Sequence, residues 1–325
     1  SRASLKLDFI RPLASVAASG TVNIDGRLND PTWAGAPQTI LTNTQAEVRF
    51  RHDAEKLYVA IQRPPVINRT GAIVPWIAKT KGEDADIWQD DCVEVFLGPA
   101  DATRVMHLGL SASGARYDAL AVGTNAGKKT WSGAWTSAVL ADTNGFAAEL
   151  ALPWTTLVAA GVPQDKLAVN VMITQSDVSA ESQKNKGGEG LNWAATRNVG
   201  EALVSLGWRG RAHVDHLIPL GLGQAPASPQ RSYTVRMHFA EPDLETKPGQ
   251  RMFDVTLQDQ TVLKGFDVVR EAGAARAALV KEFKGVKATD VLTLSFTGAA
   301  TPSTPGTSPI ISGLEIIEES NNSGK

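Results

Sequence analysis

The chain has 325 residues, a formal net charge of −2 and one cysteine, Cys92. This length exceeds what one hydrophobic core usually fills, so we expect two domains, and the near-neutral charge without a basic run argues against a nucleic-acid partner. No apolar stretch approaches the roughly 20 residues of a membrane span, and a single cysteine excludes an internal disulfide, which is compatible with the cytosol, a bacterial periplasm or secretion.

Short β-strand patterns run through the whole chain. They alternate apolar and polar residues or are rich in β-branched residues, and Gly, Pro, Asn and Asp separate them. They lie at residues 46–53, 56–62, 92–98, 105–114, 145–153, 167–176, 233–241, 251–269, 291–298 and 310–317. Helical periodicity is sparse, and the best candidate is "REAGAARAALVKEF" at 270–283. We therefore predict an all-β protein made of two β-sandwich, jelly-roll-like domains.

Two segments rich in Pro, Ser and Gly mark the organisation of the chain. "GLGQAPASPQR", at 221–231, is typical of a linker, and "TGAATPSTPGTSP", at 297–309, is typical of a long loop. We expect an N-terminal strand in residues 1–17, a first sandwich at 18–222, a linker at 223–231 and a second, partial sandwich at 232–320.

The segment "DIWQDDCVEVFLGP", at 86–99, combines a tryptophan, several carboxylates and a strand. Period-2 alternation points Val93, Val95 and Leu97 toward a core and places Trp88, Asp90, Cys92, Glu94 and Phe96 on the other parity. Glu94 thus lies between Cys92 and Phe96, where a lone buried carboxylate is costly. It needs a partner, either a protein side chain or a hydroxyl-rich ligand.

All eight tryptophans precede the linker. They are Trp33, Trp76, Trp88, Trp131, Trp135, Trp154, Trp193 and Trp208. Most should belong to the core, because tryptophan buries a large apolar area. Eight exceed what one small sandwich needs, so we expect one or two at the surface, where an exposed ring stacks on the C–H face of a sugar. Trp88, in a polar loop before a strand, is the leading candidate.

Five motifs in order make residues 18 to 222 resemble the family 9 carbohydrate-binding modules, which belong to a wider group of DOMON-like sandwiches. They are "TVNIDGRLNDPTWAGAP", "KLYVAIQ", "IWQDDCVEVFLGP", "NGFAAELALPWTTL" and "LAVNVMITQSD". The resemblance implies a sugar site containing Trp88 and Glu94, in which a second tryptophan completes a clasp around a terminal sugar. Trp208 and Trp193 are the candidates, with Trp208 ranked higher.

His107 occupies a strand position where some relatives carry an arginine. If the strands around 92–98 and 105–111 form a hairpin, His107 falls opposite Glu94, and a Glu–His pair would then satisfy the carboxylate without any ligand. Some DOMON-like relatives bind haem. His107 and Met172 would be the ligands needed here, because Met106 and His107 are adjacent and point to opposite faces.

Residues 229 to 320 resemble the later half of malectin domains, which are sugar-binding β-sandwiches. The motifs are "YTVRMHFAEP", "GQRMFDVTLQDQTVLKGFDVVREAG" and "SPIISGLEIIEE". The family's sugar-contacting aromatic residues are not matched, so we expect a structural or interaction module with Phe239, Phe253, Phe266 and Phe296 as core. Residues 4–13, "SLKLDFIRPL", are a hypothetical donor of a missing strand.

Catalytic and metal motifs are weak. The sequence contains no G-x-S-x-G, no H-E-x-x-H and no strand-preceded phosphate loop, and Glu94 has no second acid at a defensible distance, so we expect no enzyme. The acidic group Asp86, Asp90 and Asp91 is a candidate Ca²⁺ site, since oxygen ligands on a loop suit that ion; the alternative is a charged loop.

These observations lead to one expected function and two alternatives. We expect non-catalytic binding of a polysaccharide or other glycan by the first sandwich, in a secreted, periplasmic or cell-surface bacterial protein, as an accessory region of a larger carbohydrate-active enzyme. The alternatives are a structural or adhesive module that binds other extracellular proteins, and a haem-binding DOMON-like carrier.

Overall fold

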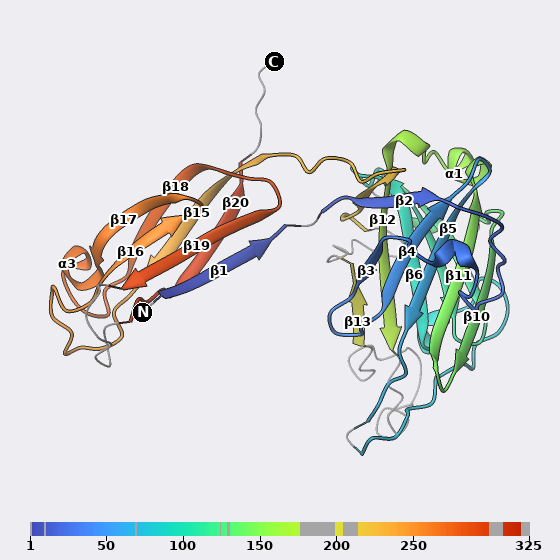
Figure 1. Ribbon diagram of the computed structural model, residues 1–325, viewed down its shortest axis with the longest axis horizontal. Helices are drawn as coiled ribbons and strands as arrows, with labels where there is room; N and C mark the ends of the chain where they lie inside the picture. Colours follow the sequence, from blue (N-terminus) through green and yellow to red (C-terminus); the bar gives the residue numbers. More distant parts are fainter. Residues whose placement is uncertain are drawn as a thin grey trace. The chain divides into compact units, whose positions relative to one another are not determined.

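The structure is a computed structural model that describes residues 2–9, 11–68, 70–123, 125–128, 131–175, 199–203, 214–298 and 308–319. The chain forms two compact units (Figure 1). The first sandwich comprises residues 12–226, and the second sandwich comprises residues 1–11 together with 227–325. Both consist mainly of β-strands, which confirms the predicted all-β class. Within the described residues, none of the helices is both long and apolar enough to span a bilayer.

Most elements of the first sandwich are strands with short connections. They are β2 (Leu13–Ala17), η1 (Pro31–Trp33), β3 (Gln38–Ile40), β4 (Glu47–His52), β5 (Lys56–Arg63), η2 (Ile87–Gln89), β6 (Cys92–Pro99), β7 (Arg104–Ser111), β8 (Arg116–Val122), β9 (Asn125–Lys128), β10 (Thr136–Asp142), β11 (Gly145–Pro153), α1 (Trp154–Ala159), η3 (Gln164–Lys166), β12 (Leu167–Gln175), β13 (Val199–Ala202) and β14 (Ile218–Leu222).

Two layers enclose the core of the first sandwich. One layer runs in the order β10-β11-β5-β4 and the other in the order β12-β6-β7-β8-β9, while β2 and β14 connect them into one continuous hydrogen-bonded path. The inward residues of both layers form a single apolar cluster that includes Val95, Leu108, Val59 and Leu150. The alternation read from the sequence therefore assigns the inward face of β6 and β7 correctly.

The second sandwich packs a four-stranded sheet, β1-β19-β16-β17, on a three-stranded sheet, β18-β15-β20. Its elements are β1 (Arg2–Asp8), β15 (Arg231–Phe239), β16 (Met252–Leu257), β17 (Gln260–Asp267), α3 (Val268–Ala272), β18 (Leu279–Ala288), β19 (Val291–Gly298) and β20 (Gly313–Glu318). The four phenylalanines expected in a core, at positions 239, 253, 266 and 296, are buried together.

The start of the chain contributes to both units. β1 lies antiparallel to β19 along its whole length. The hypothesis that residues 4–13 donate a strand to the second sandwich concerns this pairing. β2 instead pairs in parallel with β14 and β4 of the first sandwich. The division therefore falls between Arg11 and Pro12, not after residue 17, because Pro12 lies between two strands that join different sheets.

The best helix candidate in the sequence, residues 270–283, is helical only at its start. Only Val268–Ala272 is helical, and Gly273, with φ of +83°, ends the helix in the left-handed conformation that glycine adopts without strain. Strand β18 begins at Leu279 and alternates half-buried Lys281 and Phe283 with exposed side chains. The period-2 pattern and the glycine outweigh the helix propensity of the alanines.

Candidate functional site

The candidate site lies on the side of the β12-β6-β7-β8 layer that faces away from the core. We call this side the outer face. It is formed by the residues between those that point inward: Asn170, Met172 and Thr174 of β12, Cys92, Glu94 and Phe96 of β6, His107, Gly109 and Ser111 of β7, and Tyr117 and Ala119 of β8. Glu94 lies between Met172 on one neighbouring strand and Gly109 on the other.

Glu94 and His107 form a buried pair. Oε2 of Glu94 lies 2.7 Å from Nε2 of His107, and the two side chains are only 7% and 4% exposed. His107 is directly opposite Phe96, not Glu94, so the expected direct opposition is wrong and the contact is diagonal across the hairpin. The predicted protein partner for the carboxylate nevertheless exists.

The pairing engages only one oxygen of the carboxylate. Oε1 of Glu94 accepts no hydrogen bond from any residue in the part of the chain that the structure describes, and it is not sealed away from solvent. An acceptor oxygen at the edge of a nearly buried carboxylate can receive an O–H or N–H group from a ligand. Such a bond is strong because a carboxylate is a good acceptor and its surroundings are largely apolar.

A row of aromatic rings crosses the outer face beside Glu94. His107 stacks on Phe96 with ring centroids 4.3 Å apart, and its edge meets Tyr117 at 4.9 Å. Tyr117 in turn contacts Trp88 edge to face at 5.4 Å. Tyr117 was not singled out in the sequence, although its place on the strand after "VMHLGLSASG" would have suggested it. The row connects the Glu94–His107 pair to a half-buried indole.

Trp88 lies in the short 3-10 helix η2, not in the strand, so the period-2 parity of β6 does not extend to it. The preceding residue, Ile87, is fully buried on the outer face, directly above Gly109. A Cβ at Gly109 would lie 2.1 Å from Cδ1 of Ile87. The glycine therefore makes the space in which Ile87 anchors η2, and this anchor holds the half-buried Trp88 beside Tyr117.

Asp90 and Asp91 hold the loop before η2. The carboxylate of Asp90 accepts the backbone N–H groups of Lys79 and Thr80 at 2.9 and 2.8 Å, and Asp91 accepts that of Ile77 at 2.7 Å. Both residues are buried. Residues 77–80 are thus fixed to the base of β6.

The candidate Ca²⁺ ligands Asp86, Asp90 and Asp91 do not form a cluster. No group of three or more Asp, Glu, His or Cys side chains among the described residues is placed to hold a metal ion. The calcium site stays a prediction, and the backbone hydrogen bonds of Asp90 and Asp91 give these two acids a structural role.

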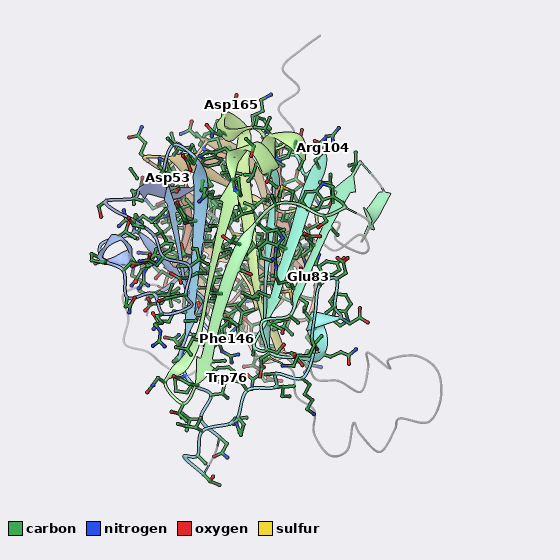
Figure 2. All side chains as sticks on the ribbon, turned by 90° about the vertical axis from the view of Figure 1, so that its right-hand side faces the viewer. Asp53, Trp76, Glu83, Arg104, Phe146 and Asp165 are labelled. Atoms are coloured by element: carbon green, nitrogen blue, oxygen red, sulfur yellow. The ribbon has the colours of Figure 1, made fainter. Side chains whose placement is uncertain are left out.

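The remaining tryptophans divide into core and partly exposed groups. Trp33, Trp135 and Trp154 are buried, whereas Trp76, Trp88 and Trp131 are half-buried. The indole of Trp76 packs on Phe146 and donates to the backbone carbonyl of Asp142, at the end of the sandwich opposite Asp165 (Figure 2). Trp193 and Trp208, the two candidates for the second clasping ring, lie outside the described residues.

Met172 and His107 share the outer face, as a haem site would require. However, Nε2 of His107 is already within hydrogen-bond distance of Glu94, and the ring is stacked on Phe96. Iron ligation through this nitrogen would have to break that bond. The arrangement favours a rigid polar pair over a haem ligand.

Comparison with known families identifies the first sandwich. A family model described as "Carbohydrate family 9 binding domain-like" matches residues 24–204, which is more than half of the chain. The chain belongs to this carbohydrate family 9 binding domain-like family. A second model, "Malectin domain", matches residues 224–302. Both families that the sequence resembles are therefore confirmed, and each match falls mainly within one unit.

Individual relatives are distant. A carbohydrate binding module family 9 from Caldicellulosiruptor kristjanssonii, solved with cellotriose, is 15% identical over 66% of this chain and all of its own, with a TM-score of 0.39. A putative carbohydrate-binding protein from Bacteroides uniformis is 12% identical over 65% of this chain and 99% of its own, with a TM-score of 0.44.

A curated relative of another kind is a probable LRR receptor-like serine/threonine-protein kinase of Arabidopsis thaliana. It is 30% identical over 99 residues, which are 27% of this chain and 10% of the kinase. The chain thus spans about a tenth of this relative.

Proposed function

We propose that the first sandwich binds carbohydrate at the outer face, through the ring of Trp88 and the Oε1 oxygen of Glu94. Membership of the carbohydrate family 9 binding domain-like family supports carbohydrate as the ligand class. The observation that carries the choice of site is a half-buried indole connected by Tyr117 to a carboxylate that keeps one free oxygen.

The two groups have complementary tasks. An indole face covers the apolar C–H side of a sugar ring, and removing that surface from water favours binding. A carboxylate oxygen accepts sugar hydroxyls and fixes the orientation of the ring. In this proposal His107 is a positioning residue: its contact with Oε2 holds the carboxylate, so Oε1 is presented without a loss of side-chain freedom upon binding.

We further propose that the protein is a non-catalytic module that works outside the cytoplasm, as part of a larger carbohydrate-active protein. Both matched families consist of binding domains, which supports this role. In this proposal the second sandwich is a structural or interaction module, because its core phenylalanines are buried and so are not available for stacking on a ligand.

Isothermal titration calorimetry with glucose, cello-oligosaccharides and a wider panel of glycans tests the function. We expect saturable binding to the wild type and at least tenfold weaker binding to Trp88→Ala, since about 1.4 kcal/mol of stacking is lost. Trp76→Ala is the matched control, because Trp76 is also a half-buried tryptophan of the same sandwich, but it packs on Phe146.

Equal melting temperatures of Trp88→Ala and the wild type would show that the loss is local. Equal affinity of Trp88→Ala and the wild type for a bound glycan would contradict the proposed site. A Soret band in the absorption spectrum of the purified protein would instead favour the haem carrier.

A further inference from the structure

The strands of the outer face carry few charged side chains. Among the strand residues that form the outer face, the only acid is Glu94 and the only basic side chain is His107, whose Nε2 faces Oε2 of Glu94. The other members are neutral. Asp215 and His216 belong to a segment that also packs on this face, where the backbone carbonyl of His216 accepts from Asn170. Arg63, a buried cation of β5 in the other layer, donates to Gln175 and has Asp91 and Glu201 as its charge partners.

The negative field of Glu94 reaches its neighbours. Burial, and secondly the charge of Glu94, raise the pKa of the Cys92 thiol well above its ordinary value, and Asp91 and Asp90 act in the same direction. Asp90 and Asp91, which follow Trp88 in the sequence, thus add to the negative electrostatic field of Glu94 around β6. A ligand at Oε1 enters a nearly buried environment in which charges are weakly screened.

A neutral sugar hydroxyl can donate to Oε1 without bringing a charge. A protonated amine on the sugar would form a charge-assisted hydrogen bond with the same oxygen. A carboxylate on the sugar would place a second negative charge near Glu94, and the described outer face offers no cation that is not already engaged.

We propose that this site selects its ligands by charge: it binds neutral sugars, binds amino sugars with a protonated amine more tightly, and rejects uronic acids. This selectivity rests on the proposed function of the outer face and specifies its ligand class. The determinant is Glu94, with His107 holding the carboxylate in place.

Four monosaccharides of the same ring configuration test the selectivity: glucose, N-acetylglucosamine, glucosamine and glucuronate, titrated at about pH 6, where a sugar amine is protonated. N-acetylglucosamine controls for the size of the substituent. We expect glucosamine to bind about tenfold tighter than N-acetylglucosamine and glucuronate about tenfold weaker than glucose. Both ratios should persist in high salt, because a nearly buried charge is only weakly screened.

The substitution Glu94→Gln removes the charge of the side chain while keeping its shape. The affinity ratio of glucosamine to N-acetylglucosamine and that of glucose to glucuronate should therefore both approach one. Asp165→Asn is the matched control: it also removes one negative charge, but from an exposed residue of η3 at the far end of β12 and β6 (Figure 2). It should leave both ratios unchanged.

The outcomes separate this inference from the proposed function. Binding of glucuronate as tight as that of glucose, or a charge preference that persists in Glu94→Gln, overturns the selectivity while leaving carbohydrate binding intact. Failure of all four sugars and of the wider glycan panel to bind overturns both.

Discussion

Two glutamates on outward faces of the first sandwich illustrate what a single carboxylate can do. Glu149 is fully buried on β11, and its oxygens accept the backbone N–H groups of Asp25 and Gly26 and the indole N–H of Trp33, at 3.0, 2.7 and 2.9 Å. Both of its oxygens are engaged, whereas Glu94 engages one. This contrast supports a structural role for Glu149 and is consistent with the binding role proposed for Glu94.

The sequence does not separate these two residues. "AELAL" around Glu149 and "VEVF" around Glu94 each place one glutamate among apolar strand residues. The partners of Glu149 come from residues more than 100 positions away, which no local pattern reveals. The sequence therefore singled out Glu94, through its nearby tryptophan, but missed Glu149.

Replacing Glu149 by alanine should destabilise the first sandwich by about 2–4 kcal/mol, because it leaves three donors without an acceptor in the protein interior. Unfolding in urea, followed by tryptophan fluorescence, measures this loss, since all eight tryptophans lie in the first sandwich. Asp165→Ala, which removes an exposed carboxylate of η3, is the control and should change the stability by less than about 0.5 kcal/mol. An equally stable Glu149→Ala would show that the three hydrogen bonds do not stabilise the fold.

Burial raises the pKa of Glu149, although its hydrogen bonds oppose the shift. Between the unfolded pKa of about 4.5 and the higher folded value, the folded state binds more protons than the unfolded state. The contribution of this residue to stability is therefore present below that window and decreases as pH rises through it. The difference in unfolding free energy between wild type and Glu149→Gln should decrease from acidic to neutral pH; a difference that grows with pH would contradict the assignment.

At the scale of elements, the position of η2 depends on the missing side chain at Gly109. The glycine lies on β7 between Glu94 on β6 and Tyr117 on β8, and it leaves the space that Ile87 fills. A strand glycine of this kind permits a close approach by another segment. Here the approaching segment carries Trp88.

Gly109→Ala should move η2 and weaken glycan binding by about tenfold, with a smaller effect on folding, because the atom that blocks the new Cβ is the end of a flexible side chain. Calorimetry with the glycan that the wild type binds measures this effect. Gly98→Ala serves as a contrast: its Cβ would lie 2.1 Å from the backbone oxygen of Arg104, so it should reduce stability strongly. An unchanged affinity of Gly109→Ala for the glycan would contradict the dependence of glycan binding on the position of η2.

Alternation along β6 and β7 predicts which residues point inward, and the hairpin between them was correctly expected. The register was not, because Glu94 lies opposite Gly109 and not opposite His107, a shift of two residues that depends on the length of the connecting turn. The 3-10 helix at Trp88 was missed for a similar reason: three residues are too few for a periodic signal. The sequence thus suffices to propose candidate site residues, but not to predict their contacts.

At the scale of the whole molecule, the second sandwich is built from both ends of the chain. β1 completes its four-stranded sheet beside β19, and the ring of Phe9 stacks on Tyr233 with centroids 4.8 Å apart. The backbone N–H of Phe9 also donates to the carbonyl of Asp290 at 2.7 Å. A segment that precedes the first sandwich in sequence is therefore part of the core of the second.

Phe9→Ala should lower the unfolding free energy of the second sandwich by about 1–3 kcal/mol, because a stacked, partly buried ring is lost. The tryptophan-monitored transition of the first sandwich should not change, as Phe9 belongs to the other unit. Circular dichroism and tryptophan fluorescence recorded during the same denaturation distinguish the two transitions. A shift of the tryptophan transition, with no other change, would contradict this division of the chain.

The central claim is that the indole of Trp88 contacts bound carbohydrate. The most direct measurement is a nuclear magnetic resonance titration of the indole N–H signals with a glycan that binds in calorimetry, with Trp88 assigned through Trp88→Phe. We predict that the Trp88 signal shifts and saturates with the glycan while those of the buried Trp33, Trp135 and Trp154 stay in place. A saturated glycan complex in which the Trp88 signal does not move would contradict the claim.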